Sequence, residues 1–164
     1  MHAVVVFETL WGNTEQLARE IAAGLGLEST DVVDAVSAPA VLEGDVDLLV
    51  VGGPTHAFSM STEKTRESAQ QQGAENIPPR GIREWIASLT SPGRDIPVAT
   101  FDTRVTSPRL PGSAAKKAMK RLVALGFRPA AKPQTFGVHG YSGPVADGEL
   151  ERARRWGEEL AATL

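Results

Sequence analysis

The chain alternates between two hydrophobic patterns, one typical of buried strands and one typical of amphipathic helices. Residues 3–8 form a Val-rich apolar run, as in a strand that is buried on both faces. Leu17, Ile21 and Leu25 then share one face of a helix that begins at Asn13. Asp147 is expected to cap the last helix. The same patterns predict further strands at 28–34, 47–52, 96–102 and 133–138, and further helices within 62–75, around 82–89, at 112–125 and after residue 147.

Strands that alternate with helices in this way predict an α/β fold in which a parallel sheet carries helices on both faces. The chain of 164 residues has no linker rich in Gly, Pro or Ser and no internal repeat, so we expect one domain spanning residues 1–164. The irregular stretches 53–62, 102–111 and 139–147 all follow the carboxyl end of a strand. Because open parallel sheets bind ligands at that edge, we expect the functional site there.

The composition excludes several classes of site. The chain contains no Cys, which excludes disulfides, thiolate metal ligands and Cys nucleophiles. Its three His residues have no metal-ligand spacing, and it lacks the GxSxG elbow of many Ser hydrolases, so we expect neither a metal centre nor Ser hydrolysis. The opening apolar run is short and contains Glu8, which argues against a signal peptide or a membrane span. We expect a cytoplasmic protein without stable membrane insertion.

Charge is distributed unevenly along the chain. The net charge is −3, yet residues 1–50 carry nine acids and one base, whereas residues 103–146 carry eight bases and no acid. The basic segment is compatible with an acidic partner or with a solvated helix face, and both interpretations stay open. Nucleic acid is not expected as a partner, because the chain is acidic overall and no aromatic residues alternate with the bases.

The turn after the first strand has the composition of a phosphate site. It lies where a helix begins, and helix N-termini offer unpaired N–H groups and the positive end of the helix dipole. Gly12 allows the backbone to approach a ligand closely. The turn contains no Lys or Arg, which suits a phosphate monoester better than a triphosphate. An ordinary capped helix start explains the same residues: Thr9, Leu10, Trp11, Gly12, Asn13 and Thr14.

A family resemblance favours the phosphate interpretation. The strand, turn and helix carry the pattern Val5-Val6-Phe7-x-Thr9-x-x-Gly12-x-Thr14-x-x-x-Ala18-x-x-Ile21. This pattern resembles the signature of the flavodoxin family. The resemblance implies a three-layer α/β/α sandwich with a five-stranded parallel sheet of order 2-1-3-4-5. It also implies that residues 9–14 bind the phosphate of the cofactor FMN, provided that the indole of Trp11 does not fill the turn.

The second loop resembles the part of a flavodoxin that brackets the flavin. It reads Gly52-Gly53-Pro54-Thr55-His56-Ala57-Phe58. The resemblance places Pro54, Thr55, His56, Ala57 and Phe58 at the cofactor. His56 occupies the position where family members usually have a stacking ring. Phe58 is the better apolar cover for the flavin, whereas His56 is suited to a hydrogen bond. A surface His and a Phe packed beneath the loop remain the alternatives.

The third loop begins Phe101-Asp102-Thr103-Arg104 and resembles the family's loop after the fourth strand. The resemblance brings Asp102, Thr103 and Arg104 to the cofactor. An Arg104 side chain near the flavin would favour an anionic reduced form, and an ion pair with Asp102 is the alternative. Tyr141, after the last strand, is either a contact at the rim of the site or an ordinary loop residue.

The resemblance implies an FMN-binding redox protein that exchanges electrons with a reductase or an acceptor protein, as a monomer or weak homodimer. No catalytic acid or base is expected, because electrons pass through the exposed edge of the flavin. One departure leaves alternatives open: no Gly lies between positions 54 and 73, where many electron carriers have one in the second loop. The alternatives are a flavoenzyme acting on a quinone or porphyrinogen, and a non-redox interaction module that has lost FMN.

Overall fold

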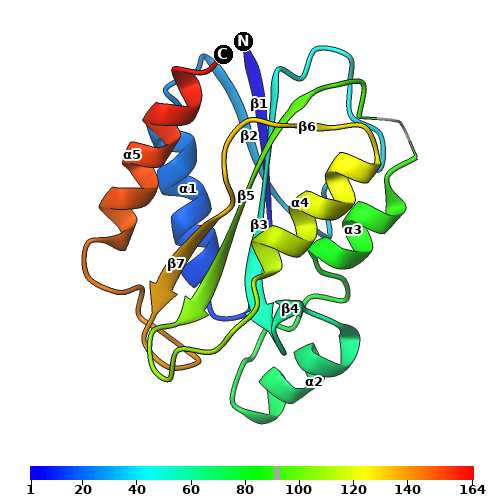
Figure 1. Cartoon of the computed structure of the whole chain (residues 1–164). Helices are drawn as coiled ribbons and strands as arrows, with labels where there is room; N and C mark the ends of the chain where they lie inside the picture. Colours follow the sequence, from blue (N-terminus) through cyan, green and yellow to red (C-terminus); the bar gives the residue numbers. More distant parts are fainter. Residues whose placement is uncertain (91–92) are drawn as a thin grey trace.

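A computed structural model describes residues 1–90 and 93–164 (Figure 1). The strands are β1 (His2–Phe7), β2 (Ser29–Asp34), β3 (Leu48–His56), β4 (Ser59–Met60), β5 (Pro97–Val105), β6 (Arg128–Pro129) and β7 (Gln134–Val138). The helices are α1 (Asn13–Leu25), α2 (Glu63–Gln71), α3 (Ile82–Ser88), α4 (Ala114–Ala124) and α5 (Glu149–Ala161). No helix in the described part of the chain is long and apolar enough to cross a membrane.

The parallel sheet has the expected order, with its last strand divided in two. Strands β2, β1, β3 and β5 are neighbours in that order, and β6 and β7 both pair in parallel with β5 on its far side. This confirms the order 2-1-3-4-5. The break between β6 and β7 lies between Pro129 and Pro133, and proline has no N–H to donate to a ladder. The short strand β4 pairs antiparallel with the end of β3, which the sequence did not predict.

Helices cover both faces of this sheet, as expected for a three-layer sandwich (Figure 1). One core lies between the sheet and helices α1 and α5, with Leu17, Ile21 and Trp156 buried in it. The other lies between the sheet and helices α3 and α4, with Trp85 and Leu122 buried. Since alternate residues of a strand face opposite sides, β1 divides its Val residues between the two cores.

The boundaries of three elements differ from the expectation. Helix α5 begins at Glu149 with Gly148 as its N-cap, so Asp147 does not cap it, contrary to the prediction. The Glu149 carboxylate instead accepts a hydrogen bond from the Gly137 N–H (2.8 Å), which ties the helix to β7. Strands β3 and β5 also continue to His56 and Val105, several residues into the expected loops. Strand geometry therefore fixes residues at the edge of the sheet where ligands bind.

Candidate cofactor site

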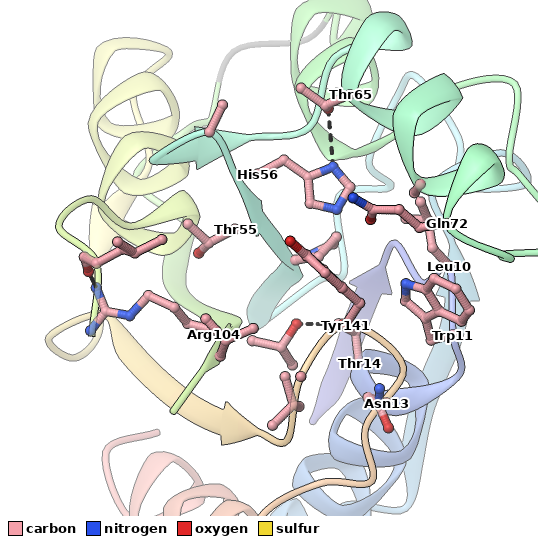
Figure 2. A pocket seen from close by; sticks show the side chains of 18 of the residues that line it. Leu10, Trp11, Asn13, Thr14, Thr55, His56, Thr65, Gln72, Arg104 and Tyr141 are labelled. Carbon is pink, nitrogen blue, oxygen red and sulfur yellow. Dashed lines mark hydrogen bonds between the residues drawn. The ribbon is translucent and has the colours of Figure 1, made fainter. Parts of the chain in front are cut away.

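A cavity of about 340 Å³ lies at the carboxyl edge of the sheet, between α2 and the loops that follow β1, β5 and β7 (Figure 2). Twelve of the fourteen predicted site residues line it: Thr9, Leu10, Trp11, Asn13, Thr14, Pro54, Thr55, His56, Ala57, Phe58, Thr103 and Arg104. Gly12 and Asp102 do not. Within residues 1–90 and 93–164, no Asp or Glu lines the cavity, and Arg104 is its one charged residue at neutral pH. The walls are therefore suited to an apolar ring that carries an anionic group.

The bend from Thr9 to Thr14 forms one end of this cavity. Gly12 is the N-cap of α1 with a φ of 92°, in the left-handed region that favours glycine, and no side chain caps the helix. The Gly12 N–H donates to Thr9 Oγ1 (2.9 Å), which stabilises the bend. The hydroxyls of Thr14 and Thr103 are hydrogen-bonded at 3.1 Å. The first N–H groups of a helix have no acceptor within it, so this helix start is suited to an anion.

Helix α4 also begins beside the cavity, but its N-terminus is already capped. Thr55 Oγ1 accepts a hydrogen bond from the Ala114 N–H (3.2 Å). Asp102 is fully buried, and its Oδ2 accepts hydrogen bonds from the Ala115 N–H (3.0 Å) and from Ser113 Oγ (2.5 Å). Asp102 is therefore an anchor for α4 behind the cavity wall. Of the two helix starts, that of α1 is the one without a side-chain cap.

The indole of Trp11 does not fill the bend from Thr9 to Thr14. It packs with Leu10 against the cluster formed by Ala69 and Ala74, and it stands along the side wall of the cavity (Figure 2). The bulk of this side chain is thus directed towards α2. The bend itself remains lined by Asn13 and the threonines around it.

A two-residue turn joins β3 to β4 at the cavity rim. Residues Ala57 and Phe58 have φ angles of 46° and 69°, both in the left-handed region, and they link the paired residues His56 and Ser59. Turns of this kind usually contain Asn or Gly, because other side chains are strained there. A Cβ at Gly112 would overlap the Phe58 backbone, so the loop before α4 packs tightly against the turn.

Arg83 holds the other side of this hairpin, a role that the sequence did not suggest. Its guanidinium donates to the carbonyl oxygens of Met60 (2.7 Å) and Ser61 (3.0 Å). The turn is therefore fixed from both sides, by the α4 loop and by α3. A single Arg in a short helix carries no pattern that would have revealed this contact.

His56 lines the cavity as a neutral imidazole with one hydrogen-bond partner on its ring. Burial, and secondly the nearby charge of Arg66, lower its pKa to about 4. His56 Nδ1 lies 3.0 Å from Thr65 Oγ1 (Figure 2). That hydroxyl donates to the Thr62 carbonyl (3.1 Å) and accepts from the Thr62 N–H (2.8 Å), so its remaining lone pair faces Nδ1. When this hydroxyl donates to the Thr62 carbonyl, Nδ1 carries the ring proton and Nε2 is the unprotonated nitrogen.

A buried polar network supports the site from below. Glu8 accepts hydrogen bonds from Ser61 Oγ (2.5 Å) and the Ile82 N–H (2.9 Å), and burial raises its pKa. Arg66 donates to the same Ser61 hydroxyl (2.8 Å) and forms an ion pair with Glu84 (2.8 Å). The network links the end of β1 to β4, α2 and α3. Glu8 stands out in the sequence as the acid that ends an apolar run, but its partners are far away in the chain.

The side chain of Arg104 orders the loop between β5 and α4. It donates to the carbonyl oxygens of Gly112 (2.6 Å) and Leu110 (3.2 Å), and it forms no ion pair with Asp102. Its position in the cavity wall is thus fixed by backbone contacts.

The loop after β7 closes the site from the opposite side. Asn13 Nδ2 donates to the Ser142 carbonyl (3.1 Å), which ties this loop to the bend from Thr9 to Thr14. The neighbouring Tyr141 lines the cavity and extends across it (Figure 2). Of the two alternatives for Tyr141, the structure supports a position at the rim of the site.

Comparisons with known proteins give matches in structure but not in sequence. No protein-family model matches the chain, and no curated protein sequence does. Flavodoxin 1 from Bacillus cereus superimposes with a TM-score of 0.72 over 100% of this chain and 99% of its own, at 18% identity. The fold is flavodoxin-like. This confirms the fold that the sequence resemblance implied.

Two further solved structures support the flavodoxin-like fold. The flavodoxin of Streptococcus pneumonia TIGR4 is 19% identical, with a TM-score of 0.70 over 100% of both chains. A WrbA-like flavodoxin from Agrobacterium tumefaciens is 18% identical, with a TM-score of 0.59 over 98% of this chain and 95% of its own. Function at such identities has to be argued from the site.

Proposed function

We propose that this flavodoxin-like chain binds FMN and transfers electrons. The observation that carries the proposal is the cavity itself: it has apolar walls, and one end is the uncapped start of α1. Its volume of about 340 Å³ lies within the range of small-molecule and cofactor sites. The residues present therefore fit a planar ring with a phosphate monoester. The names of the superimposed flavodoxins agree with this assignment.

The residues around the cavity divide into two groups by role. The bend from Thr9 to Thr14 would bind the phosphate through backbone N–H groups and hydroxyls, with the dipole of α1 favouring its charge. His56 and Phe58 would frame one side of the ring, and Arg104 the other. Bound FMN supplies reversible electron transfer, and the protein binds it, orients it and excludes water from part of it. No side chain is required as an acid or base.

Titration with two ligands tests the proposal. Protein prepared free of flavin is titrated with FMN and with riboflavin, which lacks the phosphate, and flavin fluorescence is followed. We expect FMN to bind at least tenfold more tightly. Thr14→Val, which keeps the shape but removes the hydroxyl, should reduce this preference by about tenfold, since a hydrogen bond to a charged group contributes about 1.5–3 kcal/mol.

Thr163→Val, at the C-terminus and away from the cavity, is the matched control and should leave both affinities unchanged. Equal affinities for FMN and riboflavin would refute a phosphate site in the bend. A protein that binds neither ligand would instead be the non-redox interaction module.

A second candidate function is a two-electron flavoenzyme acting on a small organic acceptor such as a quinone. The fixed turn at Ala57 and Phe58 favours it, because Gly112 and Arg83 hold both sides and leave little freedom for a peptide to reorient. Photoreduction of the FMN-loaded protein separates the two functions. A carrier should take up electrons in two resolved one-electron steps, whereas the enzyme should show one two-electron step.

A further inference from the structure

The mouth of the cavity exposes large apolar side chains from three separate loops. Phe58 is 52% exposed, Leu110 46% and Tyr141 67%, and all three line the cavity. They come from the β3–β4 turn, the loop before α4 and the loop after β7. Figure 2 shows Tyr141 extending across this opening. Exposed aromatic side chains gathered at one place are typical of the centre of a protein–protein interface.

The surface on one side of these exposed apolar side chains is basic, and we call it the flank. Arg109 is exposed in the loop before α4, and Lys116 and Lys117 are exposed in the first turn of that helix. The helix starts at the cavity, because its Ala114 N–H is bonded to Thr55 in the cavity wall. The sequence has no Asp or Glu from 103 to 146. Within the described residues these three cations form no ion pair, so their charge is available to a partner.

We propose that the cavity mouth is a docking surface for an acidic protein. The partner would cover Phe58, Leu110 and Tyr141 with apolar side chains, and its carboxylates would meet the cations of the flank. The role of this docking surface rests on the proposed redox function, since a partner docked here would lie next to the ligand in the cavity. The docking itself requires no ligand.

The arrangement favours a protein over nucleic acid or an anionic membrane as the partner. Proteins that bind single strands place aromatic side chains along a basic groove. Here the apolar side chains surround a hollow, and the bases lie to one side of it. The rest of the chain is acidic, with nine acids in residues 1–50, which opposes binding to an extended polyanion.

Binding of model polymers tests the proposal without flavin. The flavin-free full chain is titrated with poly(Glu,Tyr) and poly(Lys,Tyr), two copolymers that share the aromatic residue and differ in charge. Amide NMR shifts report the surface that is contacted. We expect poly(Glu,Tyr) to bind at least tenfold more tightly, with shift changes concentrated at residues 58, 110 and 141 and in the first turn of α4.

Charge reversal then locates the interaction. The double variant Lys116→Glu/Lys117→Glu should weaken binding of poly(Glu,Tyr) by about tenfold. Lys132→Glu is the control, because this exposed lysine precedes the amino end of β7, whereas the cavity lies at the carboxyl ends of the strands, and it should change affinity by less than about twofold. Equal weakening by both variants would overturn the assignment, as would shift changes confined to other surfaces.

Single-stranded DNA and phosphatidylserine vesicles are two further probes. Binding of either as tight as that of poly(Glu,Tyr) would overturn the choice of an acidic protein. The outcome of this test can also be distinguished from the outcome of the FMN titration. A protein that takes up FMN but shows no preference for poly(Glu,Tyr) retains the proposed function and refutes the docking surface. One that binds poly(Glu,Tyr) at the mouth without taking up FMN supports the docking surface alone.

Discussion

His56 makes the stability of the fold depend on pH in a defined window. Burial beside Arg66 lowers its pKa from 6.5 to about 4 in the folded state. Between these two values the unfolded chain binds a proton that the folded chain does not. The contribution of His56 to the free energy of unfolding is therefore fully present above pH 6.5, and it is lost as the pH decreases towards 4. Replacing His56 with Gln, which does not titrate, should remove this part of the pH dependence.

The size of the effect follows from the same pKa. A decrease from 6.5 to about 4 corresponds to a loss of about 3 kcal/mol in the free energy of unfolding by pH 4. The ring is only half-buried, so solvent screening reduces the expected loss to about 2 kcal/mol. Glu8 works in the opposite sense, because its raised pKa makes the folded state less stable as the pH rises above 4.5. Comparing the two proteins cancels the contribution of Glu8.

Urea denaturation at neutral pH and at pH about 4 measures the effect. The wild type should lose about 2 kcal/mol more than His56→Gln on acidification. The ring Hε1 resonance gives the pKa directly by NMR titration. A His56 pKa near 6.5, or identical pH dependence in the two proteins, would refute the burial and charge argument.

Three further substitutions test the geometry around the cavity. Ala57→Gly should raise the free energy of unfolding by about 1 kcal/mol in thermal denaturation, because Gly adopts a positive φ without strain; a loss of stability would contradict the left-handed turn. Thr65→Val should move the His56 ring proton from Nδ1 to Nε2 in ¹⁵N NMR spectra, and an unchanged tautomer would contradict the hydrogen-bond assignment. Asp102→Asn should destabilise the fold by about 1–2 kcal/mol with unchanged FMN affinity, because this carboxylate anchors α4; weakened FMN binding with unchanged stability would place it in the site instead.

The layers and the sheet order could be predicted because the central strands and the helices that pack on them have strong local patterns. The apolar run of β1 has to be buried on both faces, and the single apolar face of α1 has to pack against the sheet. The division of the last strand into β6 and β7 was harder to predict from the sequence. It depends on where Pro129 and Pro133 interrupt pairing with β5, a contact between distant segments.

Asp102, one of the two predicted site residues that do not line the cavity, faces away from it for a simple geometric reason. Strand β5 continues to Val105, so its side chains alternate through the segment that was expected to be a loop. Thr100 and Asp102 face α4, whereas Phe101 and Thr103 face α1. The resemblance identified the segment, but the side of the sheet that each residue faces depends on where the strand ends.

Residues of the supporting network were beyond sequence reasoning for a different reason. Glu8 follows β1, Ser61 follows β4 and Ile82 begins α3, so these residues meet only once the sheet and α3 have formed. No local pattern pairs a carboxylate at the end of β1 with a hydroxyl more than fifty positions later. The role of Thr65 was hidden similarly, because it depends on the tautomer of His56.

These long-range contacts bear on how the cavity binds a ligand. The bend from Thr9 to Thr14 is bonded to β5 through Thr14 and Thr103 and to the last loop through Asn13. Thr55 connects the hairpin to α4. Each bond joins segments that would otherwise move independently at the cavity. The loops of such a site are already ordered before a ligand binds. Less of the interaction free energy is therefore lost to conformational entropy on binding. Loss of any one bond should therefore weaken binding even where the residue does not touch the ligand, because the loops would have to become ordered as the ligand binds.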